Sequence, residues 1–122
     1  MARILVVDDS EVMRKNLKHI LIEGGHKVVG EASNGNEAVA LNDELKPDLI
    51  TMDLSMPGLD GITLVKIIMN KYPESKIIVI TALSQKSLIY EAIKNGAKHY
   101  IMKPIDKLKV LGTINDTLNA QS

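Results

Sequence analysis

Short apolar runs alternate along the chain with longer stretches in which apolar residues recur every three or four positions. The five runs, several of them rich in Val and Ile, are Arg3–Val7, Lys27–Ala32, Leu49–Met52, Lys76–Ile80 and His99–Met102. Because each is short and bounded by polar or turn residues, these runs predict strands. Their starts are separated by 24, 22, 27 and 23 residues, a spacing that leaves room for a helix of about three turns and two loops between strands.

The stretches between the runs have the periodicity of amphipathic helices. The residues that mark them are Met13, Leu17, Ile20 and Leu21; Ala38, Leu41 and Leu45; Ile62, Val65, Ile68 and Met69; Leu88, Ile89, Ala92 and Ile93; and Leu108, Leu111 and Leu118. Boundary signals agree, since Asn34 with Glu37 forms a capping-box variant, and Gly24-Gly25, Tyr72-Pro73 and Asn95-Gly96 are typical of helix ends. Alternating strands and helices predict an α/β fold with a parallel sheet covered on both faces.

Length and composition limit the classes of function. The 122 residues, 45% of them hydrophobic, suit one domain over residues 1–122 with a core of its own. Fifteen basic and fifteen acidic side chains cancel, so no sequence-wide positive field favours nucleic acid or an anionic membrane. Cysteine is absent, which excludes thiol nucleophiles and thiolate metal sites. We expect a soluble cytoplasmic protein that neither binds nucleic acid directly nor inserts into a membrane.

Polar side chains follow four of the five predicted strands. Asp8 and Asp9 follow the first, Asp53 the third, Thr81 the fourth and Lys103 the fifth, whereas the second strand has no such group and is predicted to lie at an edge. In open parallel sheets, ligands bind outside the carboxyl ends of the strands. The sequence therefore predicts that three carboxylates, a hydroxyl and an amine share one edge of the sheet.

Three carboxylates in one pocket repel one another unless a cation intervenes. Lys103 is expected to balance only one of them, so the residues indicate a divalent cation on oxygen ligands, Mg²⁺ rather than zinc. Taken singly, the same residues have structural explanations: Asp9 or Ser10 would cap the first helix, Thr81 would end a strand, and Lys103 would be solvated. No dinucleotide, P-loop or nucleophile-elbow motif is present.

Four segments resemble the receiver domain of two-component response regulators. They are Val6-Val7-Asp8-Asp9, the stretch from Asp53 through Met56-Pro57-Gly58 to Asp60-Gly61, Ile80-Thr81-Ala82, and Lys103-Pro104. The resemblance covers Arg3 to Leu118. It implies a flavodoxin-like (βα)5 three-layer fold with five parallel strands in the order 2-1-3-4-5.

The resemblance also implies roles for individual residues. Asp53 is expected to accept a phosphoryl group from a histidine kinase, and Lys103 and Thr81 to assist. Asp9, Asp53 and the backbone carbonyl of Ser55 correspond to Mg²⁺ ligands, with Asp8 acting directly or through water. Tyr100 matches the switch aromatic, for which the alternative is an ordinary half-buried strand residue.

The resemblance is strongest to single-domain chemotaxis regulators, and implies control of the flagellar motor through the face formed by the fourth helix, the fifth strand and the fifth helix. Lys86, Tyr90 and Lys107 are the expected contacts there, and the protein is expected to be a monomer. Two alternatives remain: a receiver domain excised from a longer regulator such as a DNA-binding transcription factor, and a haloacid-type phosphatase. The latter would need two Asp separated by one residue, whereas Asp8 and Asp9 are adjacent.

Three finer expectations follow from the same resemblance. The Lys103–Pro104 bond is expected to be cis, and Pro57-Gly58 with Asp60-Gly61 is expected to form a turn beside the site. Ser55 and Leu83 lie two residues beyond Asp53 and Thr81, where side chains hold or exclude the hydrolytic water. Because neither orients water well, we expect slow self-dephosphorylation, which would suit a system with a separate phosphatase.

Overall fold

The computed structural model describes residues 1–56 and 60–120, without the side chain of Leu83. Its strands are β1 (Arg3–Val7), β2 (Lys27–Ala32), β3 (Leu49–Asp53), β4 (Ile77–Thr81) and β5 (His99–Met102). All five predicted strands are present. The strand β3 extends one residue further than expected and β4 is shifted by one, so Asp53 and Thr81 are the last residues of their strands rather than the first residues after them.

The helices of the described residues follow the strands in turn. They are α1 (Glu11–Glu23), α2 (Gly35–Leu45), α3 (Gly61–Lys71), α4 (Lys86–Lys94) and α5 (Lys107–Asn119), with a short 3₁₀ helix at Leu83–Gln85. The helices α1, α3 and α4 end where Gly24-Gly25, Tyr72-Pro73 and Asn95-Gly96 predicted. Gly25 has a φ of +87°, a left-handed conformation that glycine adopts without a steric penalty, and the chain turns there toward β2.

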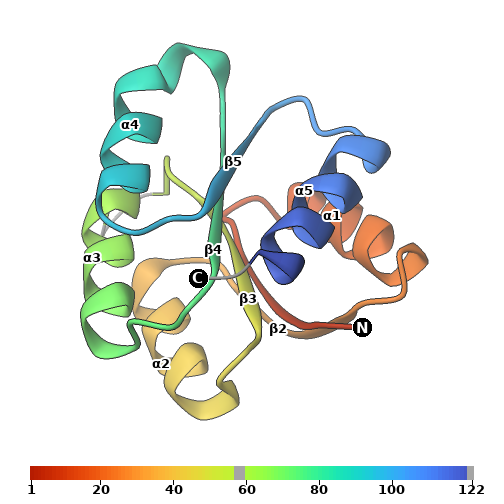
Figure 1. The fold of residues 1–122 in the computed structure, drawn as a ribbon, viewed down its shortest axis with the longest axis horizontal. Coiled ribbons are helices and arrows are strands. Elements are labelled where there is room, and N and C mark those ends of the chain that lie inside the picture. Colours follow the sequence, from red (N-terminus) through yellow and green to blue (C-terminus); the bar gives the residue numbers. More distant parts are fainter. Residues whose placement is uncertain (57–59, 121–122) are drawn as a thin grey trace.

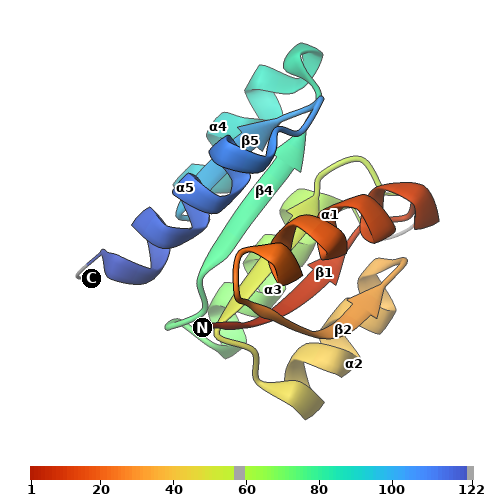
Figure 2. The same cartoon turned by 90° about the vertical axis from the view of Figure 1, so that its right-hand side faces the viewer.

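The five strands form one parallel sheet in the order β2-β1-β3-β4-β5, as the resemblance implied. Figure 1 shows the three layers: α2, α3 and α4 cover one face of the sheet, and α1 and α5 cover the other. Seen from the side in Figure 2, α1 and α5 lie in front of the strands. The strand β2, which has none of the candidate site residues at its end, lies at an edge of the sheet, as predicted. The four strands that carry the candidate site residues, β1, β3, β4 and β5, are therefore consecutive in the sheet.

Each face of the sheet has its own hydrophobic core, because successive strand residues point to opposite sides. Val7, Met52 and Val79 face the α2–α3–α4 layer and pack with Leu64 and Ala92. The residues between them in the strands face the α1–α5 layer, where the core comprises Ile4, Val6, Leu17, Leu21, Ile78, Ile80, Val110 and Ile114, among others. The central strands β1, β3 and β4 are buried on both sides, which explains their nearly continuous apolar sequence, whereas β2 and β5 at the edges are partly exposed.

The local capping signals are largely confirmed. Asn34 Oδ1 accepts a hydrogen bond from the Glu37 backbone N at 2.8 Å and so caps α2. The reciprocal bond differs from a standard capping box, because Glu37 Oε1 accepts from the Ser33 backbone N, at 2.7 Å, rather than from Asn34. Among the two candidates for the cap of α1, Ser10 is the cap: its Oγ accepts from the Met13 backbone N at 3.2 Å. The Asp9 carboxylate is therefore not used as a helix cap.

One predicted helix face is wrong in part. Leu108 was expected to mark the inward face of α5, but it is 80% exposed. The buried residues of α5 are Val110, Ile114 and Thr117, spaced by four and three positions, and this spacing fixes which side of the helix meets the sheet. Leu108 precedes Val110 by two positions, about 200° around the helix, and so lies on the opposite side.

Of the predicted turn, Pro57-Gly58 lies outside the described residues, whereas Asp60 caps α3 and Gly61 is the first residue of that helix. Across residues 1–56 and 60–120, no helix combines the length and apolar character that crossing a bilayer would require.

Candidate functional site

The carboxyl ends of four strands bring together the polar groups predicted from the sequence. Asp8 directly follows β1, Asp53 ends β3, Thr81 ends β4 and Lys103 directly follows β5. Because β1, β3, β4 and β5 are consecutive neighbours in the sheet, these ends lie side by side at one edge. Asp8 and Asp53 are each only 3% exposed, and Thr81 is fully buried.

Three carboxylates form a cluster at this edge. One oxygen from each of Asp8, Asp9 and Asp53 lies within 4.8 Å of the others. Asp8 and Asp53 are buried whereas Asp9 is exposed, so the cluster is open to solvent on the side of Asp9. A set of three carboxylate oxygens with access to water fits a hard cation such as Mg²⁺, which retains waters, and it does not resemble the nitrogen and sulfur ligands typical of structural zinc.

Lys103 lies between two of these carboxylates. Its Nζ is 3.7 Å from Asp8 Oδ2 and 3.7 Å from Asp53 Oδ2. The ammonium group is therefore shared between two carboxylates, and its single positive charge offsets only one of the three negative charges of the cluster. The Lys103–Pro104 peptide bond is cis, as expected. The Lys103 backbone N donates to the Thr81 carbonyl at 2.8 Å, which ties the two strand ends together.

The surroundings of Asp8 disfavour its ionised form. Burial raises the pKa of the Asp8 carboxyl above its ordinary value, and the nearby Asp53 charge raises it further. A hydrogen bond of 2.8 Å from the Ser10 backbone N and the charge of Lys103 oppose this rise in the pKa without cancelling it. The cluster therefore keeps an unfavourable negative charge that a bound cation would relieve.

Gln85 was not predicted from the sequence and contacts two residues of the site. Its Oε1 accepts a hydrogen bond from Ser55 Oγ at 3.0 Å and a second one from Thr81 Oγ1. The Ser55 backbone N in turn donates to Asp53 Oδ1 at 3.0 Å. The only sequence signal for Gln85 is its position four residues after Thr81. The side chain of Leu83, which was expected to cover the approach of water, lies outside the described part of the structure.

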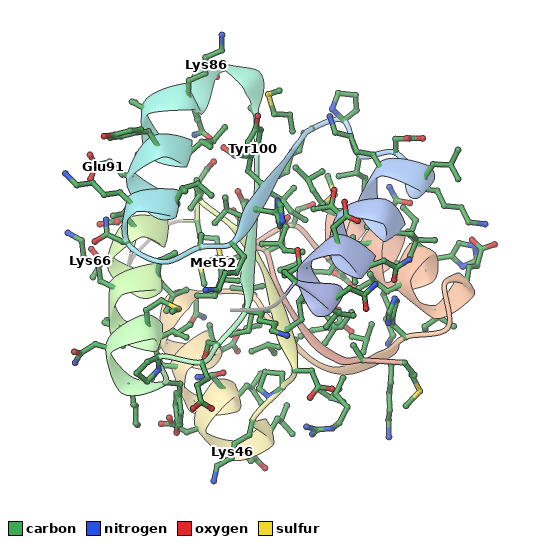
Figure 3. The ribbon with its side chains drawn as sticks, viewed as in Figure 1. Lys46, Met52, Lys66, Lys86, Glu91 and Tyr100 are labelled. Carbon is green, nitrogen blue, oxygen red and sulfur yellow. The ribbon has the colours of Figure 1, made fainter. Side chains whose placement is uncertain are left out.

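Tyr100 lies on β5 and is 45% exposed, so its ring is not enclosed by the core. It lines a groove between α4 and β5 together with Lys86, Ile89, Tyr90 and Met102. Figure 3 shows Lys86 at the start of α4 and Tyr100 on the neighbouring β5. Of the expected contact residues, Lys86 and Tyr90 line this groove, whereas Lys107 pairs with Glu23 of α1 through an Nζ–Oε2 distance of 3.2 Å.

Comparison with known proteins agrees with this arrangement. The family model of the response regulator receiver domain matches residues 4–115. The chain belongs to this family. It is 48% identical over 113 residues to the chemotaxis protein CheY of Thermotoga maritima, covering 93% of this chain and 94% of that protein.

Solved receiver domains have the same fold. The response regulator domain of Thermotoga maritima CheB is 40% identical, with a TM-score of 0.89 and 98% of each chain covered. A CheX–CheY–BeF₃–Mg²⁺ complex from Borrelia burgdorferi contains a chain that is 33% identical, with a TM-score of 0.91, covering 98% of this chain and 90% of that one. This receiver domain therefore has the flavodoxin-like fold and is a two-component signalling module closely similar to CheY, rather than a classical enzyme.

Receiver domains bind Mg²⁺ through acidic residues, and they work with histidine kinases and downstream target proteins. In this receiver domain, the acidic residues that form a cluster are Asp8, Asp9 and Asp53.

Proposed function

We propose that the protein is a response regulator in which Asp53 accepts a phosphoryl group from the phosphohistidine of a histidine kinase. The carboxylate oxygen of Asp53 attacks phosphorus, a P–O bond forms, the P–N bond to the imidazole breaks, and the imidazole leaves with the bonding electrons and takes up a proton. The observation that carries this proposal is the position of Asp53: a buried carboxylate at a strand end, 3.7 Å from the Lys103 ammonium group and inside an acidic cluster.

The chain offers groups for each requirement of phosphoryl transfer, which depends mainly on positioning and on neutralising charge. Asp9, Asp53 and the backbone carbonyl of Ser55 would hold Mg²⁺, with Asp8 contributing directly or through water. The bound ion would supply positive charge beside the phosphoryl oxygens. Lys103 would hold a further phosphoryl oxygen from the side of β5, and the Thr81 hydroxyl would donate a hydrogen bond to another.

The output of this reaction would be a change in partner binding at the face formed by α4, β5 and α5. Phosphorylation would shift a pre-existing equilibrium, with Thr81 drawn toward the phosphoryl group and Tyr100 turned inward. Tyr90 and Tyr100, 66% and 45% exposed, give the α4–β5 groove an accessible apolar surface for a target protein. The similarity to CheY favours chemotaxis, with the flagellar motor switch as the target of the receiver domain over residues 1–122. Slow self-dephosphorylation would suit a separate phosphatase, and we expect the protein to be a monomer.

A receiver domain excised from a longer regulator, such as a DNA-binding transcription factor, is less well supported. The alignment with the Thermotoga maritima chemotaxis protein covers 94% of that relative, so the similarity extends over nearly all of a chemotaxis regulator.

The test is phosphorylation by a small donor. The wild-type protein incubated with Mg²⁺ and acetyl phosphate should gain the mass of one phosphoryl group, measured on the intact protein. Asp53→Asn should abolish that gain while leaving the fold intact, because the amide is nearly isosteric but is not a nucleophile of this kind. Asp116→Asn, at an exposed position of α5, is the matched control and should be phosphorylated like the wild type. A phosphoryl gain that persists in Asp53→Asn would place the acceptor elsewhere.

A further inference from the structure

The Gln85 side chain joins two strand ends to the start of α4. Gln85 is the last residue of the 3₁₀ helix Leu83–Gln85 and directly precedes α4. Its single amide oxygen accepts from Ser55 Oγ, two residues beyond β3, and from Thr81 Oγ1, the last residue of β4. The two lone pairs of that oxygen are thus both used by hydroxyls that flank Asp53.

The Thr81 hydroxyl has one proton and can donate one strong hydrogen bond at a time. In this structure the acceptor is Gln85. Because Thr81 is fully buried, its hydroxyl cannot turn to bulk water if it leaves that acceptor. For the hydroxyl to donate a hydrogen bond to a phosphoryl oxygen, its bond to Gln85 must therefore break as the new bond forms.

We infer that Gln85 is a positioning residue that holds Thr81 in the unphosphorylated arrangement and competes with the phosphoryl group for the Thr81 hydroxyl. This inference rests on the proposed function, since it takes Asp53 as the phosphoryl acceptor. Breaking the bond leaves the Gln85 amide oxygen with only the hydrogen bond from Ser55 Oγ, which loosens the attachment of the start of α4 to the strand ends. The next residue, Lys86, lines the groove that contains Tyr100. The Gln85 side chain therefore connects the phosphorylation site to the output face.

The direction of the effect follows from the competition. Removing the Gln85 acceptor leaves the Thr81 hydroxyl of the free protein without this hydrogen bond. The phosphoryl-bound state is not affected at this position, because there the hydroxyl donates to a phosphoryl oxygen. Affinity for a phosphoryl mimic should therefore rise by about three- to tenfold, the range expected for one net hydrogen bond.

The experiment measures the binding of beryllofluoride in the presence of Mg²⁺ by calorimetry. Gln85→Leu keeps most of the side-chain volume without an acceptor, and should bind beryllofluoride about three- to tenfold more tightly than the wild type. Gln85→Ala is a second variant in case leucine packs poorly. Ser84→Ala, one residue earlier in the same 3₁₀ helix, is the matched control and should bind like the wild type. Unchanged affinity in both Gln85 variants would overturn the inference.

A double-mutant cycle separates competition for Thr81 from a general disturbance of α4. In a Thr81→Ala background, Gln85→Leu should no longer change the affinity for beryllofluoride, because the hydroxyl for which the two acceptors compete is gone. An equal gain in affinity in that background would show a structural effect on α4 and overturn the inference. If the wild-type protein fails to bind beryllofluoride in the presence of Mg²⁺, the proposed function itself is wrong, and the role inferred for Gln85 is then wrong as well.

Discussion

Thr51 places a hydroxyl inside the sheet where no group of the described residues accepts its hydrogen bond. The residue is fully buried in the middle of β3, between Val6 of β1 and Ile78 of β4. A buried hydroxyl without a partner costs free energy, because it loses its hydrogen bonds to water and gains none in the protein.

Thr51→Val should therefore raise the free energy of unfolding by about 1 kcal/mol, since it exchanges the hydroxyl for a methyl group of similar size. Urea denaturation measures the change. The matched control is Thr117→Val in α5, where the buried hydroxyl donates to the Thr113 carbonyl at 2.8 Å and the same exchange should give no such gain. Equal stability of Thr51→Val and the wild type would mean that the hydroxyl does find a partner.

The raised pKa of Asp8 has a predictable effect on stability. A carboxyl whose pKa is higher in the folded state than its ordinary 3.8 destabilises the fold wherever it is ionised. That cost is present at neutral pH and disappears as the pH falls through the folded-state pKa toward 3.8. Asp8→Asn removes the charge and keeps an oxygen that can accept from the Ser10 backbone N.

In the absence of Mg²⁺, Asp8→Asn should therefore unfold at a higher temperature than the wild type at pH 7. The difference in Tm should shrink as the pH is lowered toward 4, because the wild-type carboxyl becomes protonated there. Calorimetric melting at several pH values in a metal-free buffer measures both trends. A variant that is less stable than the wild type at pH 7 would mean that the attraction to Lys103 outweighs the cost of burial.

At the scale of elements, the start of α3 depends on Asp60. Its Oδ1 accepts from the Thr63 backbone N at 2.9 Å, and its Oδ2 accepts from Thr63 Oγ1 at 3.0 Å. These bonds cap the helix and hold the pKa of the Asp60 carboxyl below its ordinary value. The next residue, Gly61, must lack a Cβ, because an added Cβ would come within 2.6 Å of Leu54 Cα.

Asp60→Ala should lower the free energy of unfolding by about 1 kcal/mol, as expected for loss of an N-cap. Asp60→Asn keeps an acceptor for the Thr63 backbone N and should recover most of that loss. Because the pKa of Asp60 is lowered in the fold, the stabilisation is present at neutral pH and is lost as the pH falls through the folded-state pKa. Denaturation of the three proteins at pH 7 checks the order, and equal stability of Asp60→Ala and Asp60→Asn would contradict the cap.

At the scale of the whole molecule, Mg²⁺ is expected to stabilise the fold, because the carboxylates proposed to bind it come from β3 and from the end of β1 and meet only in the native sheet. At a free Mg²⁺ concentration of about 100 times Kd, this linkage amounts to about 2.7 kcal/mol. Asp9→Asn should weaken the stabilisation sharply, and Asp116→Asn should not. Melting temperatures measured across a Mg²⁺ titration give both results.

Without Mg²⁺, Asp9→Asn should melt above the wild type, because one of three mutually repelling carboxylates is removed. A fall in the metal-free melting temperature would contradict the repulsive cluster. An equal response of Asp9→Asn and the wild type to Mg²⁺ would exclude Asp9 as a ligand.

The sequence by itself determined the α/β class, the five strands and the polar groups at their ends. The reason is physical, because strands buried on both faces require continuous apolar runs, and the residue at which each run stops can be read directly from the sequence. The motif residues Asp8, Asp9, Asp53, Thr81 and Lys103 could therefore be placed at one sheet edge from their positions alone.

Only the tertiary structure decided how these groups meet. The position of Lys103 midway between Asp8 and Asp53 depends on distances across the sheet, which no local pattern encodes. The contacts of Gln85 depend on the path of the chain between β4 and α4, and the exposure of Leu108 depends on how α5 is rotated against its neighbours. These three features are set by packing between segments that are distant in the sequence. Apolar periodicity in the sequence predicts a helix, but it does not determine which segments that helix packs against.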